Sequence, residues 1–189
     1  MIVRDAAMAP AGKRVAAALE GCWATVSSEF GSIVADVARD SWAEALKALR
    51  DRAGLDWFDW LSAVDEMDRP EPGVRLVCRA QSSADHSGVL VRTLLPAGDL
   101  RAPTAAGTWA GAAWHERETA EMFGVAFEGA ASAAPLLLPA GFAGHPLRKD
   151  FGLDARGARP WPGAVEPGDS TTGRRRPPGL PEPTTEAGP

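Results

Sequence analysis

Residues that bind metals or clusters are scarce in this chain of 189 residues. It contains only two cysteines, Cys22 and Cys78, and three histidines, His86, His115 and His145. The cysteines form no CxxC pair, and no Cys/His spacing suits zinc or an iron–sulfur cluster. We therefore predict no metal site. We expect the cysteines to be reduced, with a disulfide between them as the open alternative.

Motifs for nucleotide binding and covalent catalysis are also missing. The sequence has neither GxxxxGK[ST] nor GxGxxG, and it has no GxSxG nucleophile elbow. Its formal net charge of −5 argues against binding to nucleic acid by phosphate neutralisation. We therefore predict no catalytic residue and no bound cofactor in this chain.

No apolar run approaches the length of a membrane span, which is about 20 residues. Residues 1–5 (MIVRD) also lack the apolar segment of a signal peptide. We therefore expect a soluble protein in the cytoplasm, with any membrane association made through partners.

What the chain does contain is enough apolar residues, 45%, to form one core. The clearest helix begins at Ser41, with Glu44 at the capping-box spacing and Gly54 at the end. Further helices are predicted at 11–20 and 108–123, and strands at 32–38, 55–64, 74–80 and 89–95. This pattern predicts an α+β fold with a mostly antiparallel sheet in the order β-α-β-β-β, covered by helices on one face. The proline-fenced residues 135–139 (PLLLP) are predicted to form a buried extended segment.

The composition changes at residue 152. Half of the 16 prolines lie in residues 152–189, and few large apolar residues follow Trp161. Such a segment buries too little surface to offset the entropy of ordering it. We predict a domain at 1–151 and a flexible tail at 152–189. The basic cluster 174–176 (RRR) is expected to be solvated, with docking or lipid-headgroup contact as the alternative.

Two dense charge clusters are the most informative feature. In the first, Arg117 and Glu121 are four residues apart on a predicted helix and can form an ion pair. Glu116 and Glu118 lie on other sides of that helix, so the carboxylates do not converge on one substrate. Large apolar neighbours such as Trp114 favour partial desolvation, and desolvated charges need partners.

The second cluster follows about thirty residues later, in residues 144–150 (GHPLRKD). Arg148 can bind a carboxylate through two parallel hydrogen bonds, and Asp150 can accept from a backbone N–H or an arginine. A surface turn that closes the domain is the alternative. Both clusters together predict a partner interface formed by Glu116, Arg117, Glu118, Glu121, His145, Pro146, Leu147, Arg148, Lys149 and Asp150.

These clusters carry a family resemblance. Residues 114–127 (WHERETAEMFGVAF) resemble the signature of the 30 kDa subunit of respiratory complex I, which in bacteria is the C-type subunit of NADH-quinone oxidoreductase. Residues 136–139 (LLLP) and 144–151 (GHPLRKDF) are similar to its closing motif. Residues 61–65 (LSAVD) are similar to its second-strand motif. The resemblance covers about 32–151, and the two charged motifs at their spacing are its specific part.

The sequence departs from the family pattern between the two motifs. The family has glycine, histidine and proline with following arginines, where this chain has residues 129–135 (GAASAAP). Glu121 stands where the family usually has aspartate. The loss of the histidine and arginines removes several charged contacts.

The resemblance implies a cofactor-free subunit of the peripheral arm, placed at the cytoplasmic side of the cell membrane. Its partners would be the subunits that hold the terminal iron–sulfur cluster and the quinone site. NADH, quinone and iron–sulfur clusters would belong to the assembly, which couples electron transfer to proton translocation. Alternatives are the equivalent subunit of a membrane-bound hydrogenase or other donor-linked dehydrogenase, a hydrolase using Glu116 or Glu118 with His115, and an interaction module that uses the basic tail.

Overall fold

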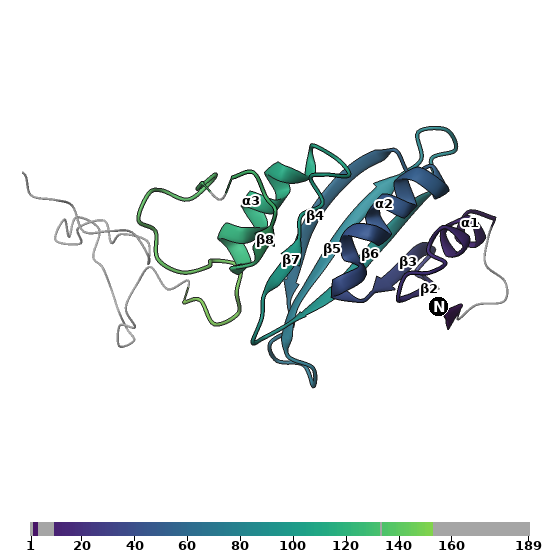
Figure 1. The fold of residues 1–189 in the computed structure, drawn as a ribbon. Coiled ribbons are helices and arrows are strands. Elements are labelled where there is room, and N and C mark those ends of the chain that lie inside the picture. Colours follow the sequence, from purple (N-terminus) through teal and green to yellow (C-terminus); the bar gives the residue numbers. More distant parts are fainter. Residues whose placement is uncertain (1, 4–9, 133, 153–189) are drawn as a thin grey trace, which may run out of the picture.

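The main element of the fold is a six-stranded sheet, seen in the computed structural model, which describes residues 2–3, 10–132 and 134–152 (Figure 1). The elements in chain order are β1 (Ile2–Val3), α1 (Pro10–Ala18), β2 (Ala24–Glu29), β3 (Ser32–Val37), the short 3₁₀ helix η1 (Arg39–Ser41), α2 (Trp42–Ala53), β4 (Trp57–Asp65), β5 (Gly73–Gln81), β6 (Gly88–Pro96), β7 (Arg101–Pro103), α3 (Ala112–Phe123) and β8 (Ala126–Glu128). The α+β class is confirmed, and the four predicted strands agree with β3, β4, β5 and β6 to within two residues.

The sheet is mixed, with the strand order β1-β2-β3-β6-β5-β4. Three neighbouring pairs are antiparallel, β2–β3, β4–β5 and β5–β6, but β1–β2 and β3–β6 are parallel. The predicted, mostly antiparallel β-α-β-β-β arrangement is therefore only partly correct. It missed β2 because the sequence ATVSSE contains little strand-like alternation. It also missed the parallel pairing of β3 with β6. The chain leaves β3 through α2, forms β4 and β5, and then returns as β6 beside β3.

Helices α1 and α2 cover one face of the sheet (Figure 1). The stripe predicted for α2 is buried, because Trp42, Leu46 and Leu49 have no exposed surface and join the same core as the sheet residues. Gly54 ends α2 in the left-handed region at φ 70°, as predicted. The capping box does not form, because Ser41 belongs to η1 and its side chain makes no capping hydrogen bond.

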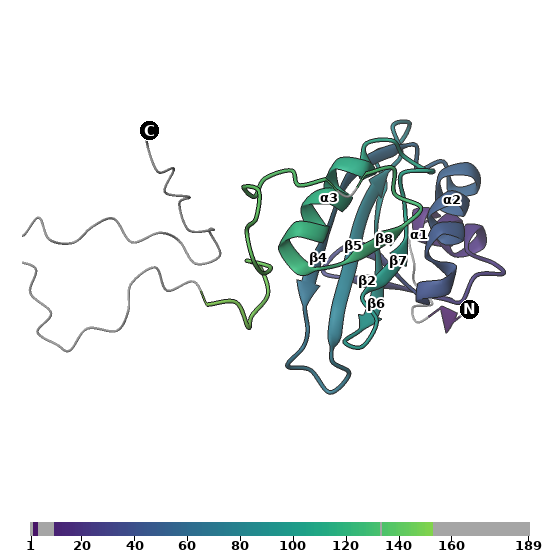
Figure 2. The same cartoon turned by 60° about the vertical axis from the view of Figure 1, so that its left-hand side comes forward.

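Helix α3 covers the free edge of β4, away from α1 (Figure 2). His115 Nδ1 lies 3.2 Å from the carbonyl oxygen of Leu61 and 3.5 Å from its nitrogen. The ring of Phe58 packs against both His115 and Trp109. A helix over an edge strand is one of the ways in which proteins protect such an edge from pairing with another chain.

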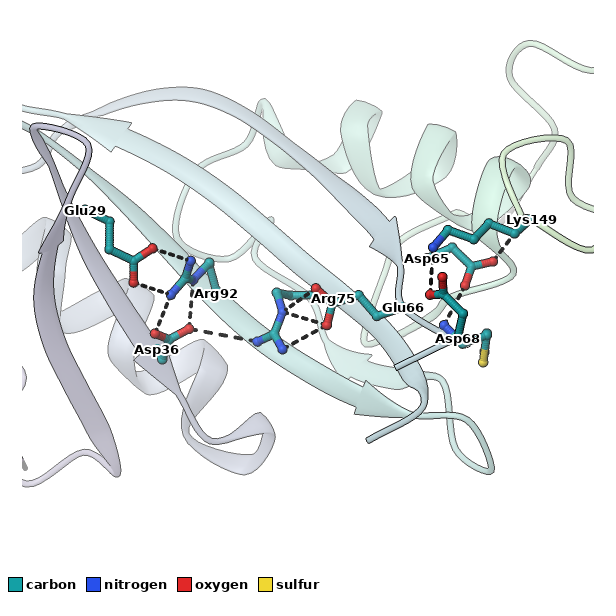
Figure 3. A network of polar contacts seen from close by, with 9 residues as sticks. Glu29, Asp36, Asp65, Glu66, Asp68, Arg75, Arg92 and Lys149 are labelled. Atoms are coloured by element: carbon teal, nitrogen blue, oxygen red, sulfur yellow. Dashed lines mark hydrogen bonds and ion pairs between the residues drawn. The ribbon is translucent and has the colours of Figure 1, made fainter. Parts of the chain in front are cut away.

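The second face of the sheet carries a row of ion pairs that crosses it from β2 to the end of β4 (Figure 3). Arg92 lies 2.9 Å from a carboxylate oxygen of Glu29 and 2.6 Å from one of Asp36, and Arg75 lies 2.9 Å from one of Glu66. These charges satisfy one another across neighbouring strands. The sequence showed arginines alternating with buried residues in β5, but not their partners.

The prediction of a buried segment at 135–139 is wrong. Leu137 is 59% exposed, and the segment forms bends rather than a strand. Its backbone N–H groups donate to the Glu121 side chain of α3 instead of to a neighbouring strand. The leucines of this segment therefore do not pack into the sheet.

Candidate functional site

The buried carboxylate of Glu116 belongs to the interior of the chain. It is 2% exposed, and it accepts hydrogen bonds from the Ala105 N–H at 2.5 Å and the Thr104 hydroxyl at 2.6 Å. Burial raises the pKa of Glu116 above its ordinary value, although these hydrogen bonds oppose the shift. Glu116 therefore fixes the loop between β7 and α3. The prediction that Glu116 belongs to the partner interface does not agree with its burial, because a partner cannot reach this carboxylate.

Arg117 and Glu121 bind the backbone of the loop that follows β8. Arg117 donates to the carbonyl oxygens of Ala134 and Pro135 at 2.9 and 2.7 Å. The Glu121 carboxylate accepts from the N–H groups of Leu136 and Leu137 at 2.5 and 2.8 Å. Among the ion pairs of the described residues, the expected pair between Arg117 and Glu121 is absent. Their charges instead fix the path of this loop.

The outward side of α3 is aromatic and charged. The Trp114 side chain is 61% exposed, and the guanidinium of Arg117 lies 5.3 Å from its ring centroid, within the range of a cation–π contact. Glu118 is exposed on the same helix. This side of α3 is therefore the part of the first cluster that a partner can reach.

The second cluster packs on the carboxyl end of α3. His145 Nδ1 lies 2.8 Å from the carbonyl oxygen of Glu121, and the Leu147 N–H donates to the Met122 carbonyl oxygen at 3.1 Å. Gly124 ends α3 at φ 78°, and a Cβ atom there would lie 2.7 Å from His145 Nε2. The two charged motifs of the sequence are thus joined through the end of one helix.

Asp65, at the end of β4, ties the second cluster to the sheet (Figure 3). Its carboxylate is 4% exposed and accepts from the N–H groups of Met67 at 2.8 Å and Lys149 at 2.9 Å. Burial alone would raise the pKa of Asp65, but these hydrogen bonds and the charges of Arg148 and Lys149 bring it below its usual value. The sequence analysis placed Asp65 only within the motif 61–65 and did not count it as a site residue. The signal that could have found it is an aspartate at the end of an apolar strand.

Arg148, Leu147 and Asp150 face outward from this cluster. The Leu147 side chain is 54% exposed, and Asp150 is exposed. Arg148 is partly buried, and its Nε lies 3.4 Å from an Asp150 carboxylate oxygen. Within the described part of the chain this Nε is buried without a hydrogen-bond partner. The Arg148 side chain as a whole is 21% exposed, so part of it is open to a partner.

The arrangement does not resemble an acid–base site. His115 contacts the backbone of β4, Glu116 points into the core, and Glu118 is exposed. Within 10–132 and 134–152, no group of three or more His, Cys, Asp or Glu residues could hold a metal ion. No helix in the described residues is both long and apolar enough to cross a membrane.

Comparisons with known proteins show which proteins this chain resembles in sequence and in fold. The sequence profile of the family described as "Respiratory-chain NADH dehydrogenase, 30 Kd subunit" matches residues 35–157. The NADH-quinone oxidoreductase C/D subunit of Azotobacter vinelandii is 37% identical over 123 residues, which cover 61% of this chain and 21% of that protein. The NADH-quinone oxidoreductase C-type subunit of Citrifermentans bemidjiense is 29% identical over 135 residues, which cover 71% of this chain and 83% of that protein.

The chain thus spans about a fifth of the longer Azotobacter relative and most of the shorter one. Among solved structures, a similar fold occurs in the membrane-bound sulfane sulfur reductase, an archaeal respiratory membrane complex. The TM-score is 0.63 at 23% identity, and the match covers 76% of this chain and 86% of that chain.

Proposed function

The chain belongs to the 30 kDa subunit family of respiratory-chain NADH dehydrogenase, and on that basis we propose that it is a cofactor-free peripheral-arm subunit of a proton-translocating NADH:quinone oxidoreductase. It acts as a scaffold, and electron transfer from NADH to quinone belongs to the whole assembly. NADH, quinone and the iron–sulfur clusters are bound by other subunits.

The observation that supports this proposal is the set of contacts made by the two family motifs within the chain. Glu121 and His145 connect them within the chain, and Asp65 anchors the second motif to the sheet. The charges therefore build a fixed surface instead of converging on a substrate. We name this surface the docking face, formed by Trp114, Arg117, Glu118, Leu147, Arg148 and Asp150.

The proposed partners of the docking face are the subunits that hold the terminal iron–sulfur cluster and form the quinone site. The Azotobacter relative is named as a C/D subunit, and this chain matches only a fifth of it. That name supports a D-type polypeptide as the neighbour of this chain. Through these partners the chain lies at the cytoplasmic side of the cell membrane.

Co-purification tests the proposal. A tagged copy of the full chain is expressed in its native host, and the proteins recovered with it are identified by mass spectrometry. We expect an iron–sulfur subunit and a quinone-site subunit. If the tagged chain is recovered alone, the proposed function is wrong.

Arg148→Ala should impair assembly while leaving the isolated domain folded. Loss of a charge pair buried across an interface costs about 2–5 kcal/mol. The measurements are native gel electrophoresis of the complex, NADH:quinone reductase activity in membranes, and circular dichroism of the isolated chain. A variant complex with normal abundance and activity would remove Arg148 from the docking face.

A related respiratory complex is the second candidate, because the fold is shared with a chain of the archaeal sulfane sulfur reductase complex. In that case the chain would have the same scaffolding position with a different electron donor. The subunits recovered with the tagged chain distinguish the two. NADH-binding subunits support the first proposal, and hydrogenase-like or sulfur-reducing subunits support the second.

A further inference from the structure

Residues 134–152, which we call the strap, run beside α3 without forming a helix or a strand. The strap lies on the side of α3 that faces away from α1 and α2 (Figure 1, Figure 2). The structure describes the whole strap, and each of its residues is exposed or half-buried. None of them belongs to the hydrophobic core. Burial of apolar surface therefore contributes little to holding the strap in place.

One end of the strap is held by two charged side chains of α3. Arg117 donates to the carbonyl oxygens of residues 134 and 135 at 2.9 and 2.7 Å. The Glu121 carboxylate accepts from the N–H groups of residues 136 and 137 at 2.5 and 2.8 Å. Hydrogen bonds to charged groups are the stronger kind. Because this end is open to solvent, water can satisfy the same groups when the strap moves away.

The other end of the strap is held by the end of α3 and by β4. The Leu147 N–H donates to the carbonyl oxygen of Met122 at 3.1 Å. The Lys149 N–H donates to the Asp65 carboxylate at 2.9 Å. Both donors belong to the strap and both acceptors to the elements beneath it. These bonds, like those at the first end, are lost when the strap leaves α3 and β4.

Contacts inside the strap connect its middle to its end. The rings of Phe142 and Phe151 stack with their centroids 6.0 Å apart and their planes at 27°. The Arg148 N–H donates to the carbonyl oxygen of His145 at 3.0 Å, and the Phe151 N–H donates to that of Arg148 at 3.1 Å. These contacts do not involve α3 or β4, so opening of the strap leaves them intact. Residues 142–151 should therefore move as one body.

We propose that the strap opens from α3 and β4 as one unit while the sheet stays folded. A segment with few buried contacts opens at a lower free energy than the whole chain, and such segments open cooperatively. The opening is a property of the chain and does not depend on the proposed function. Its consequence rests on that function, because the docking face combines Leu147, Arg148 and Asp150 of the strap with residues of α3. The docking face is complete only while the strap is closed.

Amide hydrogen exchange of the full chain tests the opening. The N–H groups of residues 136, 137, 147 and 149 should share one opening constant to within about threefold, and they should open at least about a hundredfold more often than the amides of β5. Strand β5 is paired on both sides and reports on unfolding of the sheet. The opening of the strap should also depend weakly on urea, because it exposes little surface. Different opening constants at the two ends, or opening only together with β5, would overturn the proposal.

A substitution at one end of the strap tests its coupling to the other. Glu121→Ala removes the acceptor of the N–H groups of residues 136 and 137, so exchange at Lys149 should also accelerate at least about tenfold. Asp65→Ala gives the reciprocal measurement, with a similar acceleration at residues 136 and 137. Glu118→Ala is the matched control, because Glu118 is exposed on the same helix. It should change exchange in the strap by less than about twofold.

The outcomes separate this inference from the proposed function. If Glu121→Ala accelerates exchange only at residues 136 and 137, the bonds of the strap open independently and the inference is wrong. If Glu118→Ala accelerates the strap as much as Glu121→Ala does, the inference also fails. Neither result changes what is recovered with the tagged chain in the native host, which tests the proposed function separately.

Discussion

At the level of single residues, Glu116 shows how a charged motif can serve the fold. Its carboxylate is buried between α3 and the loop at Thr104 and Ala105, where two short hydrogen bonds satisfy it. Glu118, two positions further along α3, is exposed. The sequence shows two similar glutamates, yet one fixes a loop and the other faces solvent.

The raised pKa of Glu116 predicts a dependence of stability on pH. Because the pKa of Glu116 is higher in the folded protein than in the unfolded chain, the folded protein binds more protons at pH values between the two pKa values. The Glu116 contribution to the free energy of unfolding should therefore fall as pH rises. We expect the free energy of unfolding of wild type minus that of Glu116→Gln to decrease from about pH 4 to pH 7 in urea titrations.

Glu118→Gln is the matched control for this experiment. Because its side chain is exposed, the corresponding difference from wild type should stay within about 0.5 kcal/mol across the same pH range. A Glu116→Gln difference that stays constant or rises with pH would contradict the burial argument.

At the level of elements, the end of α3 joins both charged motifs. Gly124 adopts a left-handed conformation, and the His145 ring occupies the space that a side chain at 124 would need. Gly54 ends α2 at a similar φ of 70°, but no heavy atom lies within 4 Å of the Cβ position there. The two helix ends thus share a backbone conformation and differ in what packs against the glycine.

Alanine substitutions at these glycines should separate strain from packing. Gly54→Ala should lower the free energy of unfolding by about 1–2 kcal/mol, the cost of the left-handed backbone. Gly124→Ala should cost about 1–3 kcal/mol more, because the new methyl group displaces His145. Urea unfolding measures both, and equal losses would show that His145 does not press on Gly124 in solution.

Asp65 should control the attachment of the closing segment. Asp65→Ala removes the acceptor of the Lys149 N–H, and a hydrogen bond to a charged group contributes about 1.5–3 kcal/mol. Amide hydrogen exchange at Lys149 should therefore accelerate roughly tenfold to a hundredfold. The exposed ion pair of Lys149 with Asp68 provides the control. Asp68→Ala should change this exchange by less than about fivefold, as expected for a surface pair.

At the level of the whole molecule, the two faces of the sheet serve different purposes. One face is covered by α1 and α2, and the other carries the ion pairs of Arg92 and Arg75 with their acidic neighbours. Those charges are already satisfied within the chain. The proposed docking face therefore lies at the α3 end of the molecule, not on the second face of the sheet.

The predicted boundary after residue 151 has a direct test. A chain ending at Phe151 should unfold with a midpoint within about 2 °C of the full chain, and it should still recover the quinone-site subunit. Loss of partner recovery with an unchanged midpoint would instead support the alternative in which the basic tail is the interaction element. Residues 153–189 lie outside the described part of the structure, so this boundary stays a prediction.

The sequence by itself determined the local elements and the family. The apolar stripe of α2, the glycine at its end and the alternation in β5 depend on side chains within the same element, so their periodicity is readable from the chain. The two charged motifs and their spacing likewise identified the family that the profile match then showed.

Only the tertiary structure decided where the charges point and how the strands pair. The Arg92 side chain donates a hydrogen bond to Asp36, which lies 56 residues away in the sequence. The Lys149 backbone N–H donates to Asp65, which lies 84 residues away. Such partners are set by the packing of distant elements, which no local pattern encodes. For the same reason the sequence could not show that Glu116 turns inward, or that Arg117 and Glu121 bind a loop backbone instead of each other.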